Sequence, residues 1–272
     1  MSSTAGSSPV LARAIAMCAD EACRSIDPKV CQIVQLLLEP TETRAANCLQ
    51  EVGFSILTTL LYLQRTLTRE PPAPVLPPGY RVLTYNAATH DRFARAILAS
   101  YEQSLDCPQL HGKRQIADII EGHKSSGEFD PNLWFVVTRN PSDDPTTDDC
   151  AALLLSPVPH HATMELVYIG LAPAARGHRL GDYFLQLALH RTHLAGLQHL
   201  TLAVDELNQP ALRLYYRHGL GEVHRRLARS DHSPRRASDR DELGSPRYPQ
   251  SALLTRTYRP KSFARDDLQT AI

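Results

Sequence analysis

The sequence lacks net charge, because its 29 lysine and arginine residues are matched by 29 aspartate and glutamate residues. A balanced chain has no global attraction for nucleic acid or an anionic membrane, so we expect neither as a partner. Its longest apolar runs, such as Ile56 to Leu63, fall short of the roughly 18–20 residues that cross a membrane. The first residues also lack the basic start and apolar core of a signal peptide. We therefore expect a cytoplasmic protein.

Cysteine pairs at the two-residue gap of zinc and redox motifs are absent among the six cysteines. Most are predicted to be small buried hydrophobic residues, with a catalytic thiol as the minor alternative. The densest histidine cluster, His160-His161, has no carboxylate or cysteine at a ligand-like spacing, so we interpret it as a loop. We expect no metal.

The chain is longer than one usual domain of roughly 100–200 residues and is divided by a proline-rich segment at 71–79, which blocks both helix and sheet. We interpret this segment as a linker between a small α/β unit at 1–70 and a larger domain at 80–260, with a tail at 261–272. Residues 229–249 are rich in Ser, Arg, Asp and Pro and are predicted to form a disordered insertion. The apolar patterns predict helices at 11–23, 41–51, 89–101, 113–123 and 182–194, and strands at 30–38, 54–67, 80–85, 133–138, 150–156, 163–171 and 200–204.

A strand, a tight turn and a helix follow one another from Glu165 to Leu194. The turn, Arg176-Gly177-His178-Arg179-Leu180-Gly181, opens the helix, whose first backbone N–H groups have no intrahelical partner and bind phosphates. Nucleotide and dinucleotide enzymes also use such a turn, but neither the three-glycine fingerprint nor the P-loop pattern is present.

These residues resemble those of the GNAT acetyltransferases, with Ile169-Gly170-Leu171-Ala172-Pro173 as the end of a central strand and Arg176 to Gly181 as the pyrophosphate loop. A second motif, from Asn208 through Ala211 and Leu214-Tyr215 to Gly219, resembles the family's next helix and lies downstream in the right order. Arg179 departs from the family's usual glycine, so either the backbone approach differs or the guanidinium contacts a phosphate.

The resemblance implies an α/β (α+β) fold of the GNAT type. Its mixed, mostly antiparallel central sheet would have flanking helices and two splayed strands, at 163–171 and 200–204. It implies transfer of an acetyl group from the co-substrate acetyl-CoA to a primary amine of a small-molecule or peptide acceptor. The residues implied to bind acetyl-CoA are Ile169, Gly170, Leu171, Arg176, Gly177, His178, Arg179, Leu180, Gly181 and Asn208.

By the same resemblance, Tyr215 is the general acid and Glu165 the general base. A capping and packing role for Asn208 and Tyr215, and a structural role for Glu165, stay open as alternatives. Asp205 and Glu206 are further candidates for the base, and Asp106-Cys107-Pro108 is expected to shape the acceptor pocket.

The segment at 1–70 resembles a truncated second GNAT unit, because its order of helix, strand, helix and strands mirrors Asp182 to Tyr258. It has no phosphate loop before Leu11, and Leu49 fills the tyrosine position, so we expect a half-repeat without a cofactor site. The sequence leaves a homodimer open. An alternative function is a catalytically weak acyl-CoA sensor or interaction module.

Overall fold

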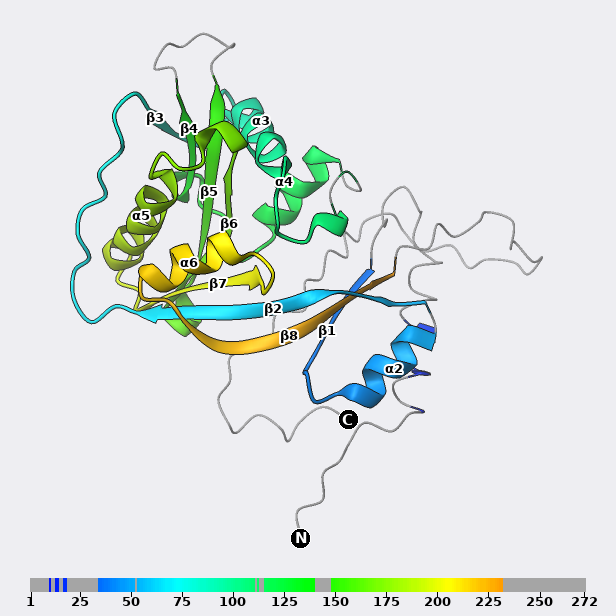
Figure 1. Cartoon of the computed structure of the whole chain (residues 1–272). Coiled ribbons are helices and arrows are strands. Elements are labelled where there is room, and N and C mark those ends of the chain that lie inside the picture. Colours follow the sequence, from blue (N-terminus) through cyan, green and yellow to red (C-terminus); the bar gives the residue numbers. More distant parts are fainter. Residues whose placement is uncertain are drawn as a thin grey trace, which may run out of the picture.

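The computed structural model describes residues 10, 13–14, 17–18, 34–51, 53–110, 112, 115–139 and 148–231. One eight-stranded sheet runs through the described part, in the order β1-β8-β2-β7-β6-β5-β4-β3. Every neighbouring pair is antiparallel except β6 and β7, which are parallel. The expected mixed, mostly antiparallel sheet is confirmed (Figure 1).

Seven of the described strands lie close to the positions that the apolar patterns predict, and the eighth, at 221–231, lies outside the predicted strand ranges. They are β1 (Val34–Leu38), β2 (Ser55–Thr66), β3 (Arg81–Thr84), β4 (Trp134–Thr138), β5 (Asp149–Val158), β6 (Thr163–Leu171), β7 (His199–Asp205) and β8 (Gly221–Asp231). The helices are α2 (Thr43–Glu51), α3 (His90–Tyr101), α4 (Ile116–Lys124), α5 (Leu180–Leu194) and α6 (Gln209–Arg217). None of the described helices is both long enough and apolar enough to cross a membrane.

Two hydrophobic cores lie on opposite faces of the sheet. On one face, α5 and α6 cover a core that includes Phe184, Leu200 and Leu212. On the other face, α3 and α4 cover a second core around Ile97 and Trp134. The sheet is therefore enclosed by helices where β3 to β7 lie (Figure 1).

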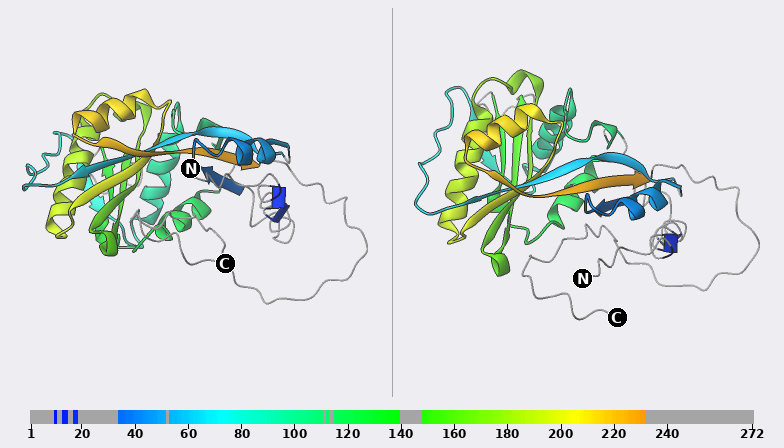
Figure 2. Two further views of the ribbon diagram at one scale, coloured as in Figure 1. Left: turned by 90° about the horizontal axis from the view of Figure 1, so that it is seen from below. Right: turned by 60° about the horizontal axis from the view of Figure 1, so that its bottom comes forward.

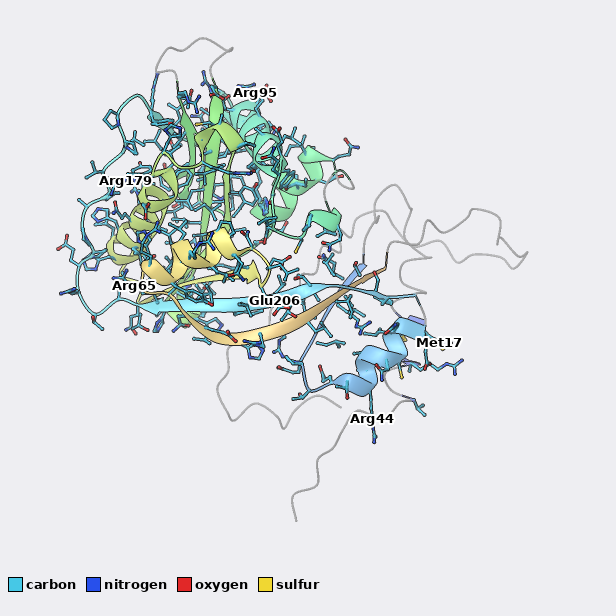
Figure 3. The ribbon with its side chains drawn as sticks, viewed as in Figure 1. Met17, Arg44, Arg65, Arg95, Arg179 and Glu206 are labelled. Carbon is cyan, nitrogen blue, oxygen red and sulfur yellow. The ribbon has the colours of Figure 1, made fainter. Side chains whose placement is uncertain are left out.

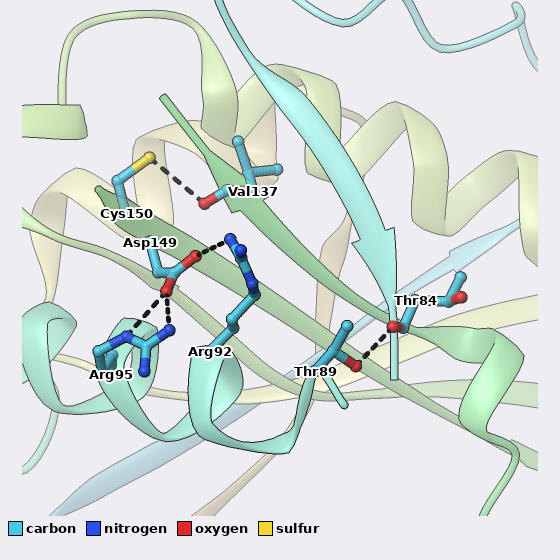
Figure 4. A network of polar contacts seen from close by, with 7 residues as sticks. All are labelled: Thr84, Thr89, Arg92, Arg95, Val137, Asp149 and Cys150. Atoms are coloured by element: carbon cyan, nitrogen blue, oxygen red, sulfur yellow. Dashed lines mark hydrogen bonds and ion pairs between the residues drawn. The ribbon is translucent and has the colours of Figure 1, made fainter. Parts of the chain in front are cut away.

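Ion pairs to a buried aspartate hold α3 against the sheet. Asp149 on β5, whose side chain is 1% exposed, accepts hydrogen bonds from Arg92 at 3.2 Å and from Arg95 at 2.7 and 2.9 Å (Figure 4). Charge-assisted hydrogen bonds of this kind fix geometry as well as charge. The end of α3, which carries residues of the cavity described below, is thereby fixed relative to β5.

The N-terminal strands join the same sheet as the rest of the chain. Strand β2 lies between β7 and β8, and β1 pairs with the outer edge of β8. Figure 2 shows β2 and β8 continuing past strands β3 to β7 as a long ribbon, with α2 at its far end. There Leu49 and Phe54 form a small separate core. The segment at 71–79 connects β2 to β3, two strands of this one sheet. The division into domains at this segment stays a prediction.

The predicted disordered insertion begins too early. Arg229 and Ser230 are buried residues of β8 and pair with β1 and β2, so their polarity did not prevent strand formation. Their partners are Leu36 and Ile56 for Arg229, and Gln35 and Ser55 for Ser230. Residues 232–249 of the predicted insertion, the tail at 261–272, and most of the predicted helix at 11–23 lie outside the described residues.

Candidate functional site

Strands β6 and β7 separate along their length and open a cleft. They pair only from Thr163 to Glu165 on β6 and from His199 to Thr201 on β7. Beyond these residues, β6 keeps its pairing to β5 through Leu171, whereas its other edge faces a cavity of about 530 Å³. This is the splay that the family resemblance implies.

Most of the predicted site residues line this cavity. Those that do are Ile169, Gly170, Leu171, Arg176, Gly177, Arg179, Leu180, Gly181, Asn208 and Tyr215. His178 and Glu165 are not among its lining residues. The structure therefore brings together two motifs that are separated in the sequence.

The turn before α5 exposes its backbone N–H groups to the cavity. Gly177 has φ of +81° and Arg179, the N-cap residue, has φ of +63°. The hydrogen bond from Tyr183 N to Arg179 O begins the helical pattern, so the N–H groups before it have no helical acceptor. With the positive end of the helix dipole, these N–H groups have the chemistry to bind an anion.

Arg179 adopts the left-handed conformation that glycine favours. For a non-glycine residue this costs about 1–2 kcal/mol, yet the turn keeps its shape and the side chain is exposed at the start of α5 (Figure 3). The departure from the family's glycine therefore leaves the left-handed turn in place.

Gly181 and Arg176 have packing roles that the sequence did not reveal. A Cβ at Gly181 would lie 2.9 Å from Leu214 Cδ2, so this glycine allows α5 and α6 to approach closely. The Arg176 guanidinium donates to the carbonyl oxygens of Leu171, Ser100, Gln103 and Glu102. Its side chain thus ties the end of α3 to the end of β6.

Helix α6 places one tyrosine toward the cavity. Asn208 caps the helix by accepting from Ala211 N at 3.3 Å, and Pro210 occupies its first turn. Tyr215 is 5% exposed and lines the cavity, whereas Tyr216 is 47% exposed. Burial, followed by the nearby charge of Asp106, raises the pKa of Tyr215 above its usual value. Its hydroxyl therefore stays protonated at neutral pH.

An ion pair joins the start of α5 to the end of α6. Burial alone would raise the pKa of Asp182, but hydrogen bonds from Arg217 and His218 outweigh it and lower the pKa. Their distances to Asp182 Oδ1 are 2.7 and 2.8 Å. Arg65 at the end of β2 also donates to His218 O. The elements β2, α5 and α6 therefore meet beside the turn that precedes α5 (Figure 3).

Glu165 lies in the part of β6 that still pairs with β7. It is half-buried opposite Thr201, and its charge, after burial, raises the pKa of Tyr62 on β2. The two residues predicted to act as acid and base therefore lie on different sides of the point where the strands separate. The catalytic assignment of Glu165 stays a prediction.

Asp205 is largely occupied by structural hydrogen bonds. Its carboxylate accepts from Thr58 Oγ1 at 2.6 Å, Leu207 N at 2.9 Å and Cys107 N at 3.2 Å. Sequence analysis named Asp205 only as a candidate base. It gave no sign of the contacts with Cys107 and Thr58, because these residues lie about 100 and 150 positions from Asp205 in the chain. No group of three or more His, Cys, Asp or Glu side chains in the described part could hold a metal ion.

Comparisons with known proteins agree with this geometry. Residues 124–220 match the model of the acetyltransferase (GNAT) family. The chain is 27% identical to a mycothiol acetyltransferase of Catenulispora acidiphila over 186 residues, covering 64% of this chain and 54% of that protein. It is 26% identical to that of Jonesia denitrificans, covering 70% and 58%. The chain thus spans somewhat more than half the length of these curated relatives.

Solved structures show the same fold. A GCN5-related N-acetyltransferase from Sphaerobacter thermophilus aligns with a TM-score of 0.57 and 19% identity, over 78% of this chain and 63% of that chain. One from Kribbella flavida aligns at 0.51 and 16%, over 83% and 77%. Residues 124–220, which carry the family match, thus hold the splayed strands and the two motifs at the cleft, and this part of the chain is similar to the GNAT acetyltransferases.

Proposed function

We propose that the cleft between β6 and β7 binds acetyl-CoA and that this protein transfers its acetyl group to a primary amine. The observation that carries the proposal is the open edge of β6 ending at a turn of exposed N–H groups. An extended pantetheine arm would pair with β6 as an added strand, and the pyrophosphate would meet the start of α5. Gly177 adds no side chain where the phosphates would approach.

Acetyl-CoA supplies a thioester, whose C–S bond breaks with the electron pair leaving on sulfur as the acceptor nitrogen forms the new C–N bond. Glu165 accepts the proton that the acceptor nitrogen loses, and a water carries it, because Glu165 does not line the cavity. Tyr215 donates its hydroxyl proton to the departing sulfur. The raised pKa keeps Tyr215 protonated at neutral pH but makes it a weaker acid, so its proton moves only as negative charge develops on the sulfur.

The acceptor belongs to the proposal only as a class, the primary amines. The relatives named mycothiol acetyltransferase support an amine-acetylating enzyme, and the acceptor's identity is left to experiment. Cytoplasmic location and homodimer formation stay predictions, which cell fractionation and sedimentation would test.

Release of CoA thiol from acetyl-CoA in the presence of a panel of primary amines tests the proposal. We expect amine-dependent thiol release and a matching N-acetylated product by mass spectrometry. Acetyl-CoA binding without turnover for any amine would favour the alternative of a sensor module. No binding of acetyl-CoA at millimolar concentration would contradict the proposal altogether.

A further inference from the structure

The loop that follows α3 reaches across the open end of the cleft. Its two ends carry the left-handed residues Gln103, with φ of +52°, and Cys107, with φ of +43°. The Arg176 guanidinium holds one end through the carbonyl oxygens of Glu102 and Gln103. Such backbone conformations cost energy and persist only where surrounding contacts enforce them. The loop is thus held in one position at the cavity, where Asp106 is among the lining residues.

Two hydrogen bonds fasten this loop to the end of β7. Asp205 N donates to Asp106 Oδ1 at 3.3 Å, and Cys107 N donates to Asp205 Oδ2 at 3.2 Å. The side chain of Asp205 is held in turn by Thr58 Oγ1 on β2 at 2.6 Å. Thr58 and Asp205 are both buried. The position of Asp106 is therefore set by a relay that starts in the N-terminal strand β2.

Asp106 lines the same cavity as Tyr215, the group proposed to protonate the departing sulfur. After burial, the negative charge of Asp106 also raises the pKa of the Tyr215 and Tyr168 hydroxyls. The thioester must lie beside Tyr215, so the acceptor nitrogen must arrive within the same region. An alkyl primary amine resembles the lysine side chain and is cationic at neutral pH. A carboxylate there would meet this cation in a partly desolvated cleft.

We propose that the Asp106 carboxylate binds the protonated amine of the acceptor in the cleft and so selects acceptors that carry a cationic amine. The proposal rests on the proposed function, because it names the acceptor side of the same site. Asp106 holds the ammonium group, and Glu165 takes one proton from it through water before attack. The second proton, which the nitrogen loses once the C–N bond has formed, returns to the Tyr215 oxygen that has protonated the sulfur. Thr58 is a positioning residue that acts on the acceptor through Asp205 and the loop.

Two thioethers of CoA test this proposal without knowledge of the natural acceptor. One carries an aminoethyl group on sulfur and the other a propyl group of similar size, so they differ in one cationic nitrogen. By calorimetry, we expect the protein to bind the aminoethyl thioether about tenfold more tightly, as a charge-assisted hydrogen bond would give. Asp106→Asn should remove this preference and leave the affinity for acetyl-CoA unchanged.

Glu102→Gln is the matched control, because Glu102 is an exposed carboxylate of the same loop and does not line the cavity. It should keep the preference, which separates a local contact from the general charge of the loop. Thr58→Val should weaken the preference, and Thr58→Ser should restore it, because serine keeps the hydroxyl that holds Asp205.

Equal affinity of the unmodified protein for the two thioethers would overturn the proposal. So would an unchanged preference in Asp106→Asn. If the unmodified protein binds neither thioether nor acetyl-CoA, it is the proposed function that fails. Acetyl-CoA affinity and the thermal unfolding midpoint, measured on each variant, show that a lost preference does not come from a damaged fold.

Discussion

Tyr215 is the residue on which the proposed chemistry depends most. Phenylalanine at this position keeps the buried ring and removes the proton donor, so Tyr215→Phe should lower kcat by about 10²–10⁴-fold with little change in acetyl-CoA affinity. Steady-state kinetics with the best amine of the panel measures this effect.

Tyr216 provides the control, since it is adjacent on α6 but 47% exposed. Tyr216→Phe should leave kcat near that of the unmodified protein. If Tyr216→Phe is the damaging change, the assignment of the acid is wrong. If neither change matters, the sulfur leaves without help from either hydroxyl.

Cys107 offers a test of the environment around Asp106 by its response to pH. Burial, then the charges of Asp106 and Asp205, raise the pKa of its thiol to about 12. A raised pKa means that the reactive thiolate is scarce at neutral pH and increases only as the pH approaches that value. In the folded protein, alkylation of Cys107 by iodoacetamide should stay slow through pH 9, as mass spectrometry of the modified peptide can show.

The same thiol should react readily when the protein is unfolded in urea, because neither burial nor the two carboxylates then act on it. Rapid alkylation of Cys107 in the folded protein at pH 7 would contradict the described packing of the loop. It would also reopen the alternative of a reactive thiol, which the raised pKa argues against.

At the scale of elements, the contact between β6 and α3 depends on a residue without a side chain. A Cβ at Gly170 would lie 2.8 Å from Ser100 Cβ on α3, and it would also collide with the Tyr168 and Ser100 hydroxyls, which are hydrogen-bonded to each other. Because Ser100 Cβ is fixed to the helix backbone, α3 would have to move. Gly170→Ala should lower the free energy of unfolding by about 1–3 kcal/mol.

Gly221 at the start of β8 is the matched control, because a Cβ there would meet nothing within 4 Å. Gly221→Ala should change the free energy of unfolding by no more than about 0.5 kcal/mol. Urea unfolding of both variants measures the difference. Equal stability of the two would mean that α3 is not packed as closely on β6 as the structure has it.

Local signals in the sequence predicted most elements but not their contacts. The cap Asn208, Pro210 and Gly219 mark the bounds of α6 within a residue or two, because these signals act on the nearest backbone. The hydrogen bonds from Arg176 to the end of α3 and from Thr58 to Asp205 join residues that only folding brings together. Phosphate-loop spacing indicated the turn, but the relation of Asp106 to β7 left no signal in the sequence.

At the scale of the whole molecule, the place of β2 could not be predicted, because strand order depends on contacts far apart in the chain. The proline-rich segment suggested two separable units, whereas β2 lies between β7 and β8 and brings Leu61 and Leu63 into the main core. Polarity likewise predicted disorder at Arg229, where pairing on both sides with β1 and β2 produces a strand.

A chain that begins at residue 71 should therefore lose cooperative folding. Without β2, the facing edges of β7 and β8 lose their pairing, and α6 loses the hydrogen bond from Arg65 to His218 O. We expect no sharp urea transition and no acetyl-CoA binding, with recovery of both when residues 34–70 are supplied as a separate polypeptide. A stable shortened chain that binds acetyl-CoA would show that 71–272 folds on its own.

The most direct test of the central claim compares the acetyl-CoA affinity of two variants, each with one substitution at one end of α5. Gly177 precedes the helix and Gly196 follows it; both have positive φ, of +81° and +68°, and both have open space where a Cβ would be. A glutamate at either position carries the same strain and charge, but only Gly177→Glu places them at the phosphate turn. By calorimetry, Gly177→Glu should weaken acetyl-CoA binding by at least about tenfold, and Gly196→Glu should bind as the unmodified protein does. Unchanged affinity in Gly177→Glu would contradict the account, because the phosphates would then bind elsewhere.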